Sequence, residues 1–292
     1  MRILDGNKTS KEIKNELAAE VKDLTKNGGK KPHLVAVLIG SNGASMTYVN
    51  WKVRDCEEIG YESTLLKFPD TISENELLKE IDRLNNDASI DGFIVQLPLP
   101  KHIDEQKVIR AIKPEKDVDG FHPENVGKMA LGLPTFLPAT PAGIVELMDR
   151  YNIETGGKHC VVMGRSHIVG MPISVLMSQN HYPGNCTVTV THSKTRNIEE
   201  ILKTADIIIA AVGIPDYVTG DMVKKGAVII DVGISRVPDQ SKKSGYRIAG
   251  DVHFESVSKK ATWITPVPGG VGPMTRAMLL KNTMLAYKMY RH

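Results

Sequence analysis

The chain is poor in the features that mark several classes of protein. It has three cysteines among 292 residues, widely separated as Cys56, Cys160 and Cys186 and without a C-x-x-C pair. This spacing argues against a disulfide framework or a zinc site and fits a reduced, cytoplasmic setting. No apolar run approaches the ~20 residues needed to cross a bilayer, and the polar N-terminal segment lacks the apolar core of a signal peptide.

The chain also has little net charge, only +3 at pH 7. Such a weak basic balance does not indicate a nucleic-acid partner, and it suits a small anionic ligand equally well. The nine histidines are scattered without metal-ligand spacing, and no nucleophile motif such as G-x-S-x-G occurs. We therefore expect a globular protein of two domains, with no metal site and no membrane or nucleic-acid partner.

Apolar runs alternate with amphipathic segments along most of the chain, which predicts an α/β fold with mostly parallel sheets. Ser73, followed by Glu76 three residues later, predicts a capping box at the start of a helix. In the first part of the chain we expect strands at 33–40, 62–68 and 91–100, and helices at 45–60 and 73–87.

The segment 113–143 is rich in proline and glycine and lacks clear periodicity, so we expect the crossing between the two domains there. Thr140 is predicted to cap the next helix, with Pro141 at its first position. The rhythm then resumes as a doubly wound, Rossmann-type pattern. Its expected strands are 159–164, 186–192, 205–213 and 227–233, and its expected helices are 169–180, 198–204 and 275–290.

The stretch "VVMGRSHIVGMP", residues 161–172, joins a strand to a helix through a glycine turn, an arrangement that binds phosphates. Gly164 permits the turn, but Ser166 stands where G-x-G-x-x-G has its second glycine, and Arg165 adds a positive charge. The next strand runs into "THSKT", around Ser193, without the acid that binds the ribose hydroxyl in NAD sites. This favours NADP over NAD, and a basic surface loop is the alternative.

Other candidate residues precede the crossing. Tyr48 and Lys52 share one face of a predicted helix, where a desolvated lysine can exchange protons near neutrality. Ordinary surface packing explains most pairs at this spacing. Gln96 is expected at the C-terminal end of a strand, where open α/β sheets bind ligands. The segment "KDVDGFHP" offers two aspartates, and "PVPGGVGP" has glycines that let the backbone approach a ligand closely.

Seven motifs occur in order over almost the whole chain: "TYVNWK", "VQLPLP", "KDVDGFHPEN", "GRSHIVGMP", "DVGISR", "GDVHF" and "TPVPGGVGPMT". In this order they resemble the bifunctional methylenetetrahydrofolate dehydrogenase/methenyltetrahydrofolate cyclohydrolase family of the FolD type. The resemblance implies an NADP-dependent oxidation of 5,10-methylenetetrahydrofolate, followed by hydrolysis to 10-formyltetrahydrofolate. It thereby implies a place in one-carbon metabolism and purine biosynthesis.

The resemblance also implies a particular domain plan. A folate-binding catalytic domain would comprise residues 1–138 and 275–292, with the last helix returning to it. A Rossmann-type NADP-binding domain would comprise residues 139–274, and the protein would be a homodimer built through these domains.

Roles for single residues follow from the same resemblance. Lys52 is implied as the catalytic lysine, Tyr48 as the ring that packs on the folate, and Gln96 as the partner that tunes the lysine. Asp119 is implied as the aspartate that holds the pterin, and Leu97 as a further substrate contact.

The NADP site carries over in the same way. Gly164, Arg165 and Ser166 match the phosphate loop, and Ser193 matches a contact to the 2′-phosphate. Ile234 is implied in the nicotinamide pocket. A loop near both folate and nicotinamide would contain Pro268 and Gly269.

Two departures and two alternatives accompany this interpretation. Gly43 stands where the family commonly has proline, which could loosen the turn before the catalytic helix, and Ala139 stands where cysteine is common. A shikimate-type NADP-dependent dehydrogenase has a similar two-domain plan and pairs its lysine with an aspartate. A non-enzymatic nucleotide-sensing domain would bind NADP without turning over a folate.

Overall fold

The computed structural model describes residues 1–40, 43–242 and 245–289, and the chain divides into two compact units. Unit 1 comprises Met1–Ser10 and Thr140–Thr275, and unit 2 comprises Lys11–Ala139 and Arg276–His292. Two long helices, α1 (Gly6–Lys26) and α10 (Val271–Met289), begin in unit 1 and continue into unit 2.

The first ten residues depart from the expected domain plan, which groups them with the folate-binding half. They lie in unit 1 because strand β1 (Arg2–Ile3) pairs in parallel with β11 (Trp263–Ile264). A two-residue strand whose partner lies about 260 positions further along the chain has no periodicity of its own by which a sequence pattern would reveal it.

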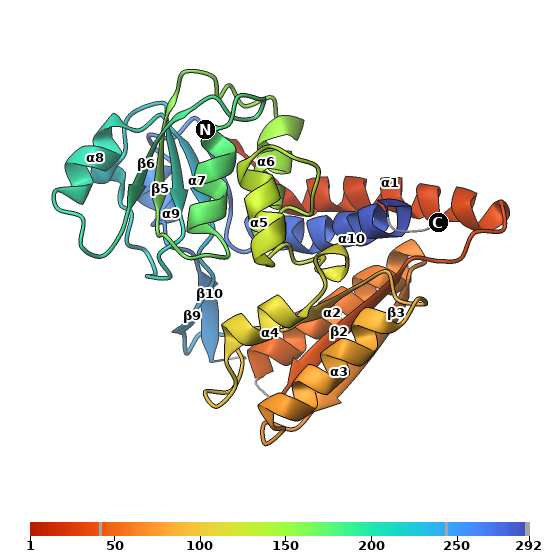
Figure 1. The fold of residues 1–292 in the computed structure, drawn as a ribbon. Coiled ribbons are helices and arrows are strands. Elements are labelled where there is room, and N and C mark those ends of the chain that lie inside the picture. Colours follow the sequence, from red (N-terminus) through yellow and green to blue (C-terminus); the bar gives the residue numbers. More distant parts are fainter. Residues whose placement is uncertain (41–42, 243–244, 290–292) are drawn as a thin grey trace. The chain divides into compact units, whose positions relative to one another are not determined.

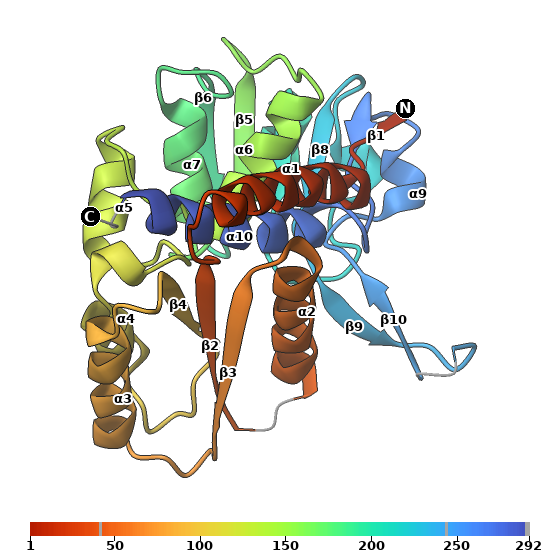
Figure 2. The ribbon, with the colours of Figure 1, turned by 90° about the vertical axis from the view of Figure 1, so that its right-hand side faces the viewer.

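Unit 2 is an α/β layer structure whose described residues include a three-stranded parallel sheet in the order β3–β2–β4. Figure 2 shows α2 and α3 on opposite sides of the strands. The strands are β2 (His33–Ile39), β3 (Glu62–Phe68) and β4 (Gly92–Val95). The helices, besides α1 and α10, are α2 (Gly43–Ile59), α3 (Glu74–Asn86), α4 (Glu105–Ala111), η1 (Pro114–Lys116) and α5 (Pro123–Ala130).

The central strand β2 explains how this layer is held together. All seven of its residues are buried, as its continuous apolar run predicts for a strand covered on both faces. Val35, Val37 and Ile39 pack with Leu77 and Ile81 of α3 in one apolar cluster, and α2 contacts β2 and β3. The sheet therefore provides a rigid frame for the residues that follow its strands.

Three sequence predictions in unit 2 have clear outcomes. The capping box is confirmed, since the Ser73 side chain accepts from the Glu76 N–H and the Glu76 side chain accepts from the Ser73 N–H. The strand expected at 91–100 is shorter, since it ends at Val95 and Pro98 has no N–H with which to extend a ladder. The segment 113–143 is not irregular throughout, because it contains α5 with Pro123 at its first position.

Helix α2 begins at Gly43. Residues 41–42 lie outside the described residues, and so does the turn that Gly43 is expected to loosen. Ala139 is buried at the start of α6 (Ala139–Arg150).

Unit 1 has the expected doubly wound architecture. Among its described residues is a six-stranded parallel sheet in the order β1–β11–β8–β7–β5–β6. Its further strands are β5 (His159–Met163), β6 (Thr187–Thr191), β7 (Ile207–Ala210) and β8 (Val228–Asp231). Its helices are α6, α7 (Gly170–Ser178), α8 (Ile198–Thr204), η2 (Gly220–Met222) and α9 (Phe254–Val257).

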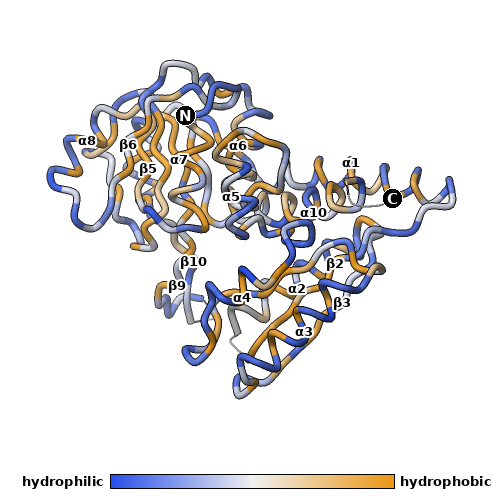
Figure 3. Tube along the Cα trace, in the orientation of Figure 1, coloured by the Kyte–Doolittle hydropathy of each residue, from blue (hydrophilic) through white to orange (hydrophobic). Residues whose placement is uncertain are grey.

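The core of unit 1 lies between the sheet and its helices. In Figure 1, α7 lies beside β5 and β6, and both strands contact it. Figure 3 shows β5 as a strongly apolar strand, in keeping with the burial of Cys160 to Met163. Short parallel strands buried on both faces have this composition.

Two details of unit 1 differ from the predictions. Thr140 does not cap α6, because the helix already begins at Ala139 and the Thr140 hydroxyl contacts the Thr275 hydroxyl at 3.0 Å. Pro141 is tolerated inside the first turn, where backbone N–H groups have no helical partner. The antiparallel hairpin of β9 (Ser235–Pro238) and β10 (Tyr246–Ala249) was not expected.

The C-terminal helix α10 also begins earlier than expected, at Val271, and the last residue of the predicted helix, Tyr290, lies outside the described residues. From Arg276 onward it belongs to unit 2, where the Tyr61 hydroxyl donates to the Leu280 carbonyl at 3.0 Å. None of the described helices is both long and apolar enough to span a bilayer.

Candidate active site

Lys52 and Gln96 meet in unit 2, although they come from different elements. Lys52 lies on α2, and its Nζ donates to Gln96 Oε1 at 3.2 Å. Gln96 follows β4 directly, and its backbone N–H donates to the Val37 carbonyl at 2.8 Å. Its side-chain amide donates to the Leu97 carbonyl at 2.7 Å, which fixes the orientation of the oxygen toward the lysine.

Asp119 completes a group of charges with Lys52. Burial lowers the pKa of the Lys52 ammonium, and the Asp119 carboxylate opposes part of this effect. Burial likewise raises the pKa of Asp119, while Lys52 pulls it back. A lysine whose pKa is depressed toward neutrality can accept and return a proton, which an ordinary surface lysine cannot do at pH 7.

The turn that carries Asp119 is held by a buried polar network. Asp117 Oδ2 accepts from the His122 N–H at 2.7 Å and from Asn125 Nδ2 at 2.9 Å. The Thr135 hydroxyl donates to Asn125 Oδ1 at 2.8 Å. Asn282 of α10 donates to the carbonyls of Val118 and Leu137, both at 2.9 Å. Side chains from three parts of unit 2 therefore fix the position of one short turn.

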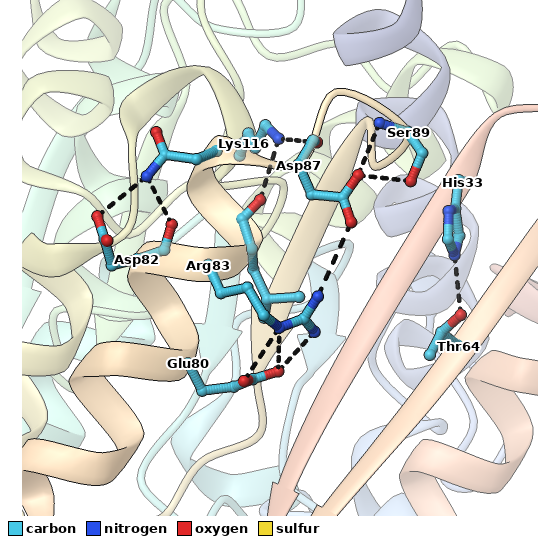
Figure 4. Close-up of polar contacts among 10 residues, drawn as sticks. His33, Thr64, Glu80, Asp82, Arg83, Asp87, Ser89 and Lys116 are labelled. Atoms are coloured by element: carbon cyan, nitrogen blue, oxygen red, sulfur yellow. Dashed lines mark hydrogen bonds and ion pairs between the residues drawn. The ribbon is translucent and has the colours of Figure 1, made fainter.

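The same turn is anchored from its N-terminal side by Lys116. Its Nζ donates to the Leu84 carbonyl at 3.0 Å and to the Asp87 carbonyl at 2.6 Å, at the C-terminal end of α3. Figure 4 shows this contact beside the ion pairs of Arg83 with Glu80 and Asp87. The Arg83 pairs are largely exposed and stabilise little, whereas Lys116 connects α3 to the chain that leads into Asp117.

Asp119 and Leu97 also share a small pocket. Besides these two and Asp117, its lining is apolar and comes mainly from β4, α4 and the 117–121 turn. The apolar wall accounts for the desolvation of the acids. Burial raises the pKa of Asp117 to about 7.

Tyr48 lies one helical turn before Lys52 on α2. Its ring meets that of Trp51 edge to face, with centroids 5.6 Å apart, and the Arg276 guanidinium lies 5.1 Å from the Trp51 ring centre. Asp55, a turn further along the helix, pairs with Arg276 at 3.1 Å and with Lys14 at 3.2 Å. These ion pairs tie α2 to α10 and α1 and so fix the helix that carries Tyr48 and Lys52.

The loop that the sequence predicts to bind phosphate begins at Gly164, directly after β5. Its φ of +107° favours glycine, and a Cβ there would lie 2.3 Å from the Ala211 carbonyl oxygen. Gly170, at the start of α7, is equally constrained, because its Cβ would lie 2.3 Å from the Gly164 carbonyl oxygen. The two glycines therefore allow close backbone contacts that a side chain at either position would prevent.

Ser166 has a local role in this loop. Its Oγ accepts from the N–H groups of Val169 and Gly170, both at 3.3 Å, at the N-terminus of α7. The hydroxyl still has its own proton to donate to an anion. Arg165 is exposed beside it. The missing glycine of G-x-G-x-x-G is thus replaced by a side chain that shapes the turn.

Ser193 reaches the same edge of the sheet. In the pairing of β5 with β6, Met163 lies opposite Thr191, so the loops after these residues are neighbours. The second loop is closed by the Thr195 hydroxyl, which accepts from the His192 N–H at 2.9 Å. Ser193 is exposed on it.

Ile234 and the 266–270 segment lie elsewhere in unit 1. Ile234 follows β8, is 47% exposed, and would have its Cδ1 atom 3.4 Å from a Cβ at Gly272. Gly269 is buried with a φ of +111°, and its carbonyl accepts from the Asn7 N–H at 3.0 Å. Pro268 is exposed next to it.

Most of the predicted residues therefore fall into two groups, and Ile234, Pro268 and Gly269 lie outside them. In unit 2, Lys52 contacts Gln96 and interacts electrostatically with Asp119, while Leu97 shares a pocket with Asp119. In unit 1, residues 164–166 and Ser193 gather at the end of two neighbouring strands. No group of three or more His, Cys, Asp or Glu suited to a metal ion occurs among the residues that the structure describes.

Sequence reasoning named Asp117 beside Asp119 as one of two aspartates in "KDVDGFHP", without a role for it. It missed four other buried side chains: Asn125 and Asn282, which support the turn of Asp119, and Asp231 and Asp251 in unit 1. Asp231 and Asp251 lie in the quoted motifs "DVGISR" and "GDVHF", and for Asp231 an acid at the end of an apolar strand was an available signal. The two asparagines had none, because their partners are backbone carbonyls or residues far away in sequence.

The fold and the site residues define a class: a two-unit α/β protein with a doubly wound, nucleotide-binding type of sheet and a separate unit with a desolvated lysine. Comparison with known proteins gives the family. The model of the tetrahydrofolate dehydrogenase/cyclohydrolase catalytic domain matches residues 4–119, and that of the NAD(P)-binding domain matches residues 138–291. The chain belongs to the tetrahydrofolate dehydrogenase/cyclohydrolase family.

Individual relatives and solved structures carry the name of the same family. A protein of Flavobacterium johnsoniae named Bifunctional protein FolD is 63% identical over 289 residues, 99% of this chain and 98% of the relative. The bifunctional FolD of Campylobacter jejuni has a TM-score of 0.93 at 46% identity over 99% of both chains. The Trypanosoma brucei FolD, complexed with NADP cofactor and inhibitor, has a TM-score of 0.92 at 39% identity over 97% of this chain and 96% of that one.

The shikimate-type alternative has a much weaker counterpart. Shikimate dehydrogenase of Aquifex aeolicus is 14% identical, with a TM-score of 0.51 over 89% of this chain and 92% of that one. That likeness extends to the fold alone.

Proposed function

We propose that this protein is a bifunctional folate enzyme. It oxidises 5,10-methylenetetrahydrofolate to 5,10-methenyltetrahydrofolate with NADP⁺, and then hydrolyses the methenyl cation to 10-formyltetrahydrofolate. The observation that carries the proposal is the desolvated Lys52, paired with Gln96 and Asp119 in a chain that belongs to the dehydrogenase/cyclohydrolase family.

Lys52 is the group that assists hydrolysis. In its neutral form, Nζ takes a proton from the water that attacks the methenyl carbon, and the ammonium returns a proton as the ring opens. Gln96 Oε1, 3.2 Å away, holds the nitrogen in place. Asp119 holds the pterin and keeps the pKa of Lys52 from falling too far, and Tyr48 and Leu97 pack on the folate.

The residues at the strand ends of unit 1 fit NADP. The exposed turn that follows Gly164 and leads to the N-terminus of α7 suits the diphosphate, and Arg165 and Ser193 suit the 2′-phosphate. The loop after β6 has no carboxylate that would repel that phosphate. When bound, NADP⁺ supplies the hydride acceptor. Ile234 lines the nicotinamide side, with Pro268 and Gly269 on the loop near both ligands.

We further propose a homodimer and a cytoplasmic location. The resemblance to the family supports a dimer through unit 1, where β6 lies at the edge of the sheet as described. Buried free thiols at Cys56, Cys160 and Cys186 support a reducing compartment. Light scattering after gel filtration would give twice the mass of the chain if the dimer is correct.

A coupled assay tests the function. The purified protein is given methylenetetrahydrofolate and NADP⁺, and the formation of NADPH and of 10-formyltetrahydrofolate is followed separately. We expect both products, and a weaker rate with NAD⁺. Turnover of shikimate instead would establish the other dehydrogenase class, and NADP binding without any folate turnover would establish a sensing domain.

A further inference from the structure

Two acids are buried together at the strand ends of unit 1. Asp231 is the last residue of β8, and Asp251 follows β10 by two residues. They are 3% and 0% exposed. Within the described residues neither carboxylate has an ion pair with a lysine, arginine or histidine. Buried carboxylates without a cation are costly, so each must be stabilised by something else.

Five backbone N–H groups provide that stabilisation. Asp231 Oδ1 accepts from Gly233 at 3.0 Å and from the Asp251 N–H at 2.9 Å, and Oδ2 accepts from Val252 at 3.0 Å. Asp251 Oδ2 accepts from Val212 at 2.6 Å and from Gly213 at 3.0 Å. The donors belong to three loops, after β7, after β8 and after β10, which the two side chains join into one arrangement.

The glycines next to the acids have no room for a side chain. A Cβ on Gly250 would lie 1.9 Å from Asp231 Oδ2, and one on Gly233 would lie 2.3 Å from Asp251 Oδ1. Contacts this close show that the carboxylates occupy the space between the loops. The segments "DVG" and "GDV", which contain Asp231 and Asp251, therefore pack directly against each other.

The two acids differ in one respect. Both oxygens of Asp231 face N–H donors, whereas Asp251 Oδ1 is buried without any hydrogen-bond partner. Burial also raises the pKa of Asp231 to about 6. A buried acid pair with an unsatisfied oxygen is costly, and apolar packing could fill the same space at a lower cost in free energy, so the pair points to a functional arrangement.

We infer that the hydrogen bonds of the Asp231 carboxylate, together with those of Asp251 Oδ2, position the cofactor loops for hydride transfer. They fix the loops after β7 and β8 at the carboxyl ends of the strands, where doubly wound sheets bind nucleotides. Asp231 bends the chain through Gly233, and Ile234 comes next with its side chain half exposed. The inference rests on the proposed function, since it assigns the pair to the nicotinamide end of the same cofactor site.

The test compares the same isosteric change at both acids. In Asp231→Asn, an NH₂ group must face a backbone N–H, whichever way the amide is turned. In Asp251→Asn, the oxygen can keep both of its donors while the NH₂ takes the place of Oδ1, which no donor faces. We expect the dehydrogenase kcat to fall roughly 10- to 100-fold in Asp231→Asn and less than about threefold in Asp251→Asn.

Further readouts separate positioning from folding. Hydrolysis of supplied methenyltetrahydrofolate should stay at the wild-type rate in both variants, because its chemistry belongs to unit 2. The isotope effect with substrate deuterated at the methylene carbon should rise in Asp231→Asn, and the affinity for NADPH should change by less than about threefold. Asp221→Asn, an exposed acid of unit 1, is the matched control.

The outcomes are distinct. Wild-type dehydrogenase kinetics in Asp231→Asn, or equal loss of both activities in proportion to the folded fraction, would overturn the inference. If Asp231→Asn does not fold, Gly233→Ala pushes on Asp251 Oδ1 instead and must show the same selective loss of dehydrogenase. A wild-type protein without either folate activity would overturn the proposed function first, and this inference with it.

Discussion

In unit 2 the central candidates, Lys52 and Asp119, are half-buried ionisable side chains that act on one another, whereas in unit 1 Arg165 and Ser193 are exposed side chains mounted on backbone turns. Lys52 and Asp119 shift each other's pKa, and neither can be altered without changing the other. Arg165 and Ser193 stand at the surface of loops whose shape is set by glycines and backbone hydrogen bonds.

This difference follows from what each unit is proposed to do. Proton transfer needs a group with a tuned pKa, and burial is the means of tuning it. Binding a dinucleotide needs donors in fixed positions, and backbone N–H groups provide these without ionisation. Changes at the buried ionisable side chains of unit 2 should therefore have strong effects, and changes at the exposed binding side chains of unit 1 should have weaker ones.

The largest expected effect is that of Lys52→Met. We expect cyclohydrolase activity to fall by about 10²- to 10⁴-fold, because the general base is lost, while hydride transfer, which needs orientation rather than a base, falls much less. The decay of methenyltetrahydrofolate absorbance measures the first, and NADPH formation the second. Lys67→Met, an exposed lysine on β3, is the matched control. Hydrolysis that stays well above the uncatalysed rate would contradict the role of Lys52.

The next effect is that of Asp119→Asn, which tests the coupling within unit 2. Loss of the carboxylate should raise the KM for the folate roughly 10- to 100-fold, as for a lost charged hydrogen bond. The carboxylate raises the pKa of Lys52, so its removal should lower that pKa further. The acid limb of the cyclohydrolase pH profile should then move to lower pH. A limb that stays in place would show that the two groups are not coupled.

The structural features that the sequence predicted have local causes. The apolar run at 33–39, the capping box at Ser73 and the glycine turn at Gly164 were all visible in the chain, since each depends on neighbours in sequence. The pairing of Lys52 with Gln96 across 44 residues came from the resemblance to a family and not from spacing.

The missed features have non-local or backbone causes. The hairpin β9–β10 and the strand β1 are short, and helix α5 lies in a segment full of proline and glycine. The partners of Asp231 and Asp251 are backbone N–H groups, which every residue except proline possesses. No sequence pattern can show which of them will meet a given carboxylate.

A smaller effect is expected from Arg165→Ala, which tests the binding unit. The KM for NADP⁺ should rise about tenfold, because one exposed charge-assisted contact to the 2′-phosphate is lost, and the KM for NAD⁺ should barely change. High salt should diminish the difference between variant and wild type. His167→Ala, exposed in the same loop, should leave both values unaltered. An equal rise for both nucleotides would place Arg165 on the diphosphate instead.

The smallest expected effect is on stability. It tests whether the burial of an acid in unit 2 makes the free energy of unfolding depend on pH. Burial raises the pKa of Asp117 to about 7, well above its ordinary value near 3.8. A raised pKa means that the folded chain holds the proton more tightly than the unfolded chain does. The contribution of this group to the free energy of unfolding is therefore complete below about pH 4 and is lost as the pH rises through about 7.

Asp117→Asn cannot titrate, so the free energy of unfolding of wild type minus that of the variant should fall between about pH 5 and pH 7. The slope should approach ~1.4 kcal/mol per pH unit and flatten above about pH 8. Asp91 and Asp231, whose pKa values burial raises to about 6, titrate in both proteins and cancel in the difference. Urea unfolding at a series of pH values measures this difference in the free energy of unfolding.

Thr135→Val is the control. It removes a hydrogen bond from the same network without removing an acid, so its curve of unfolding free energy against pH should stay parallel to that of wild type. If the curve for Asp117→Asn also stays parallel to that of wild type, Asp117 is solvated in the folded protein. The pKa shifts of Lys52 and Asp119 would then not result from burial that extends to all acids around them.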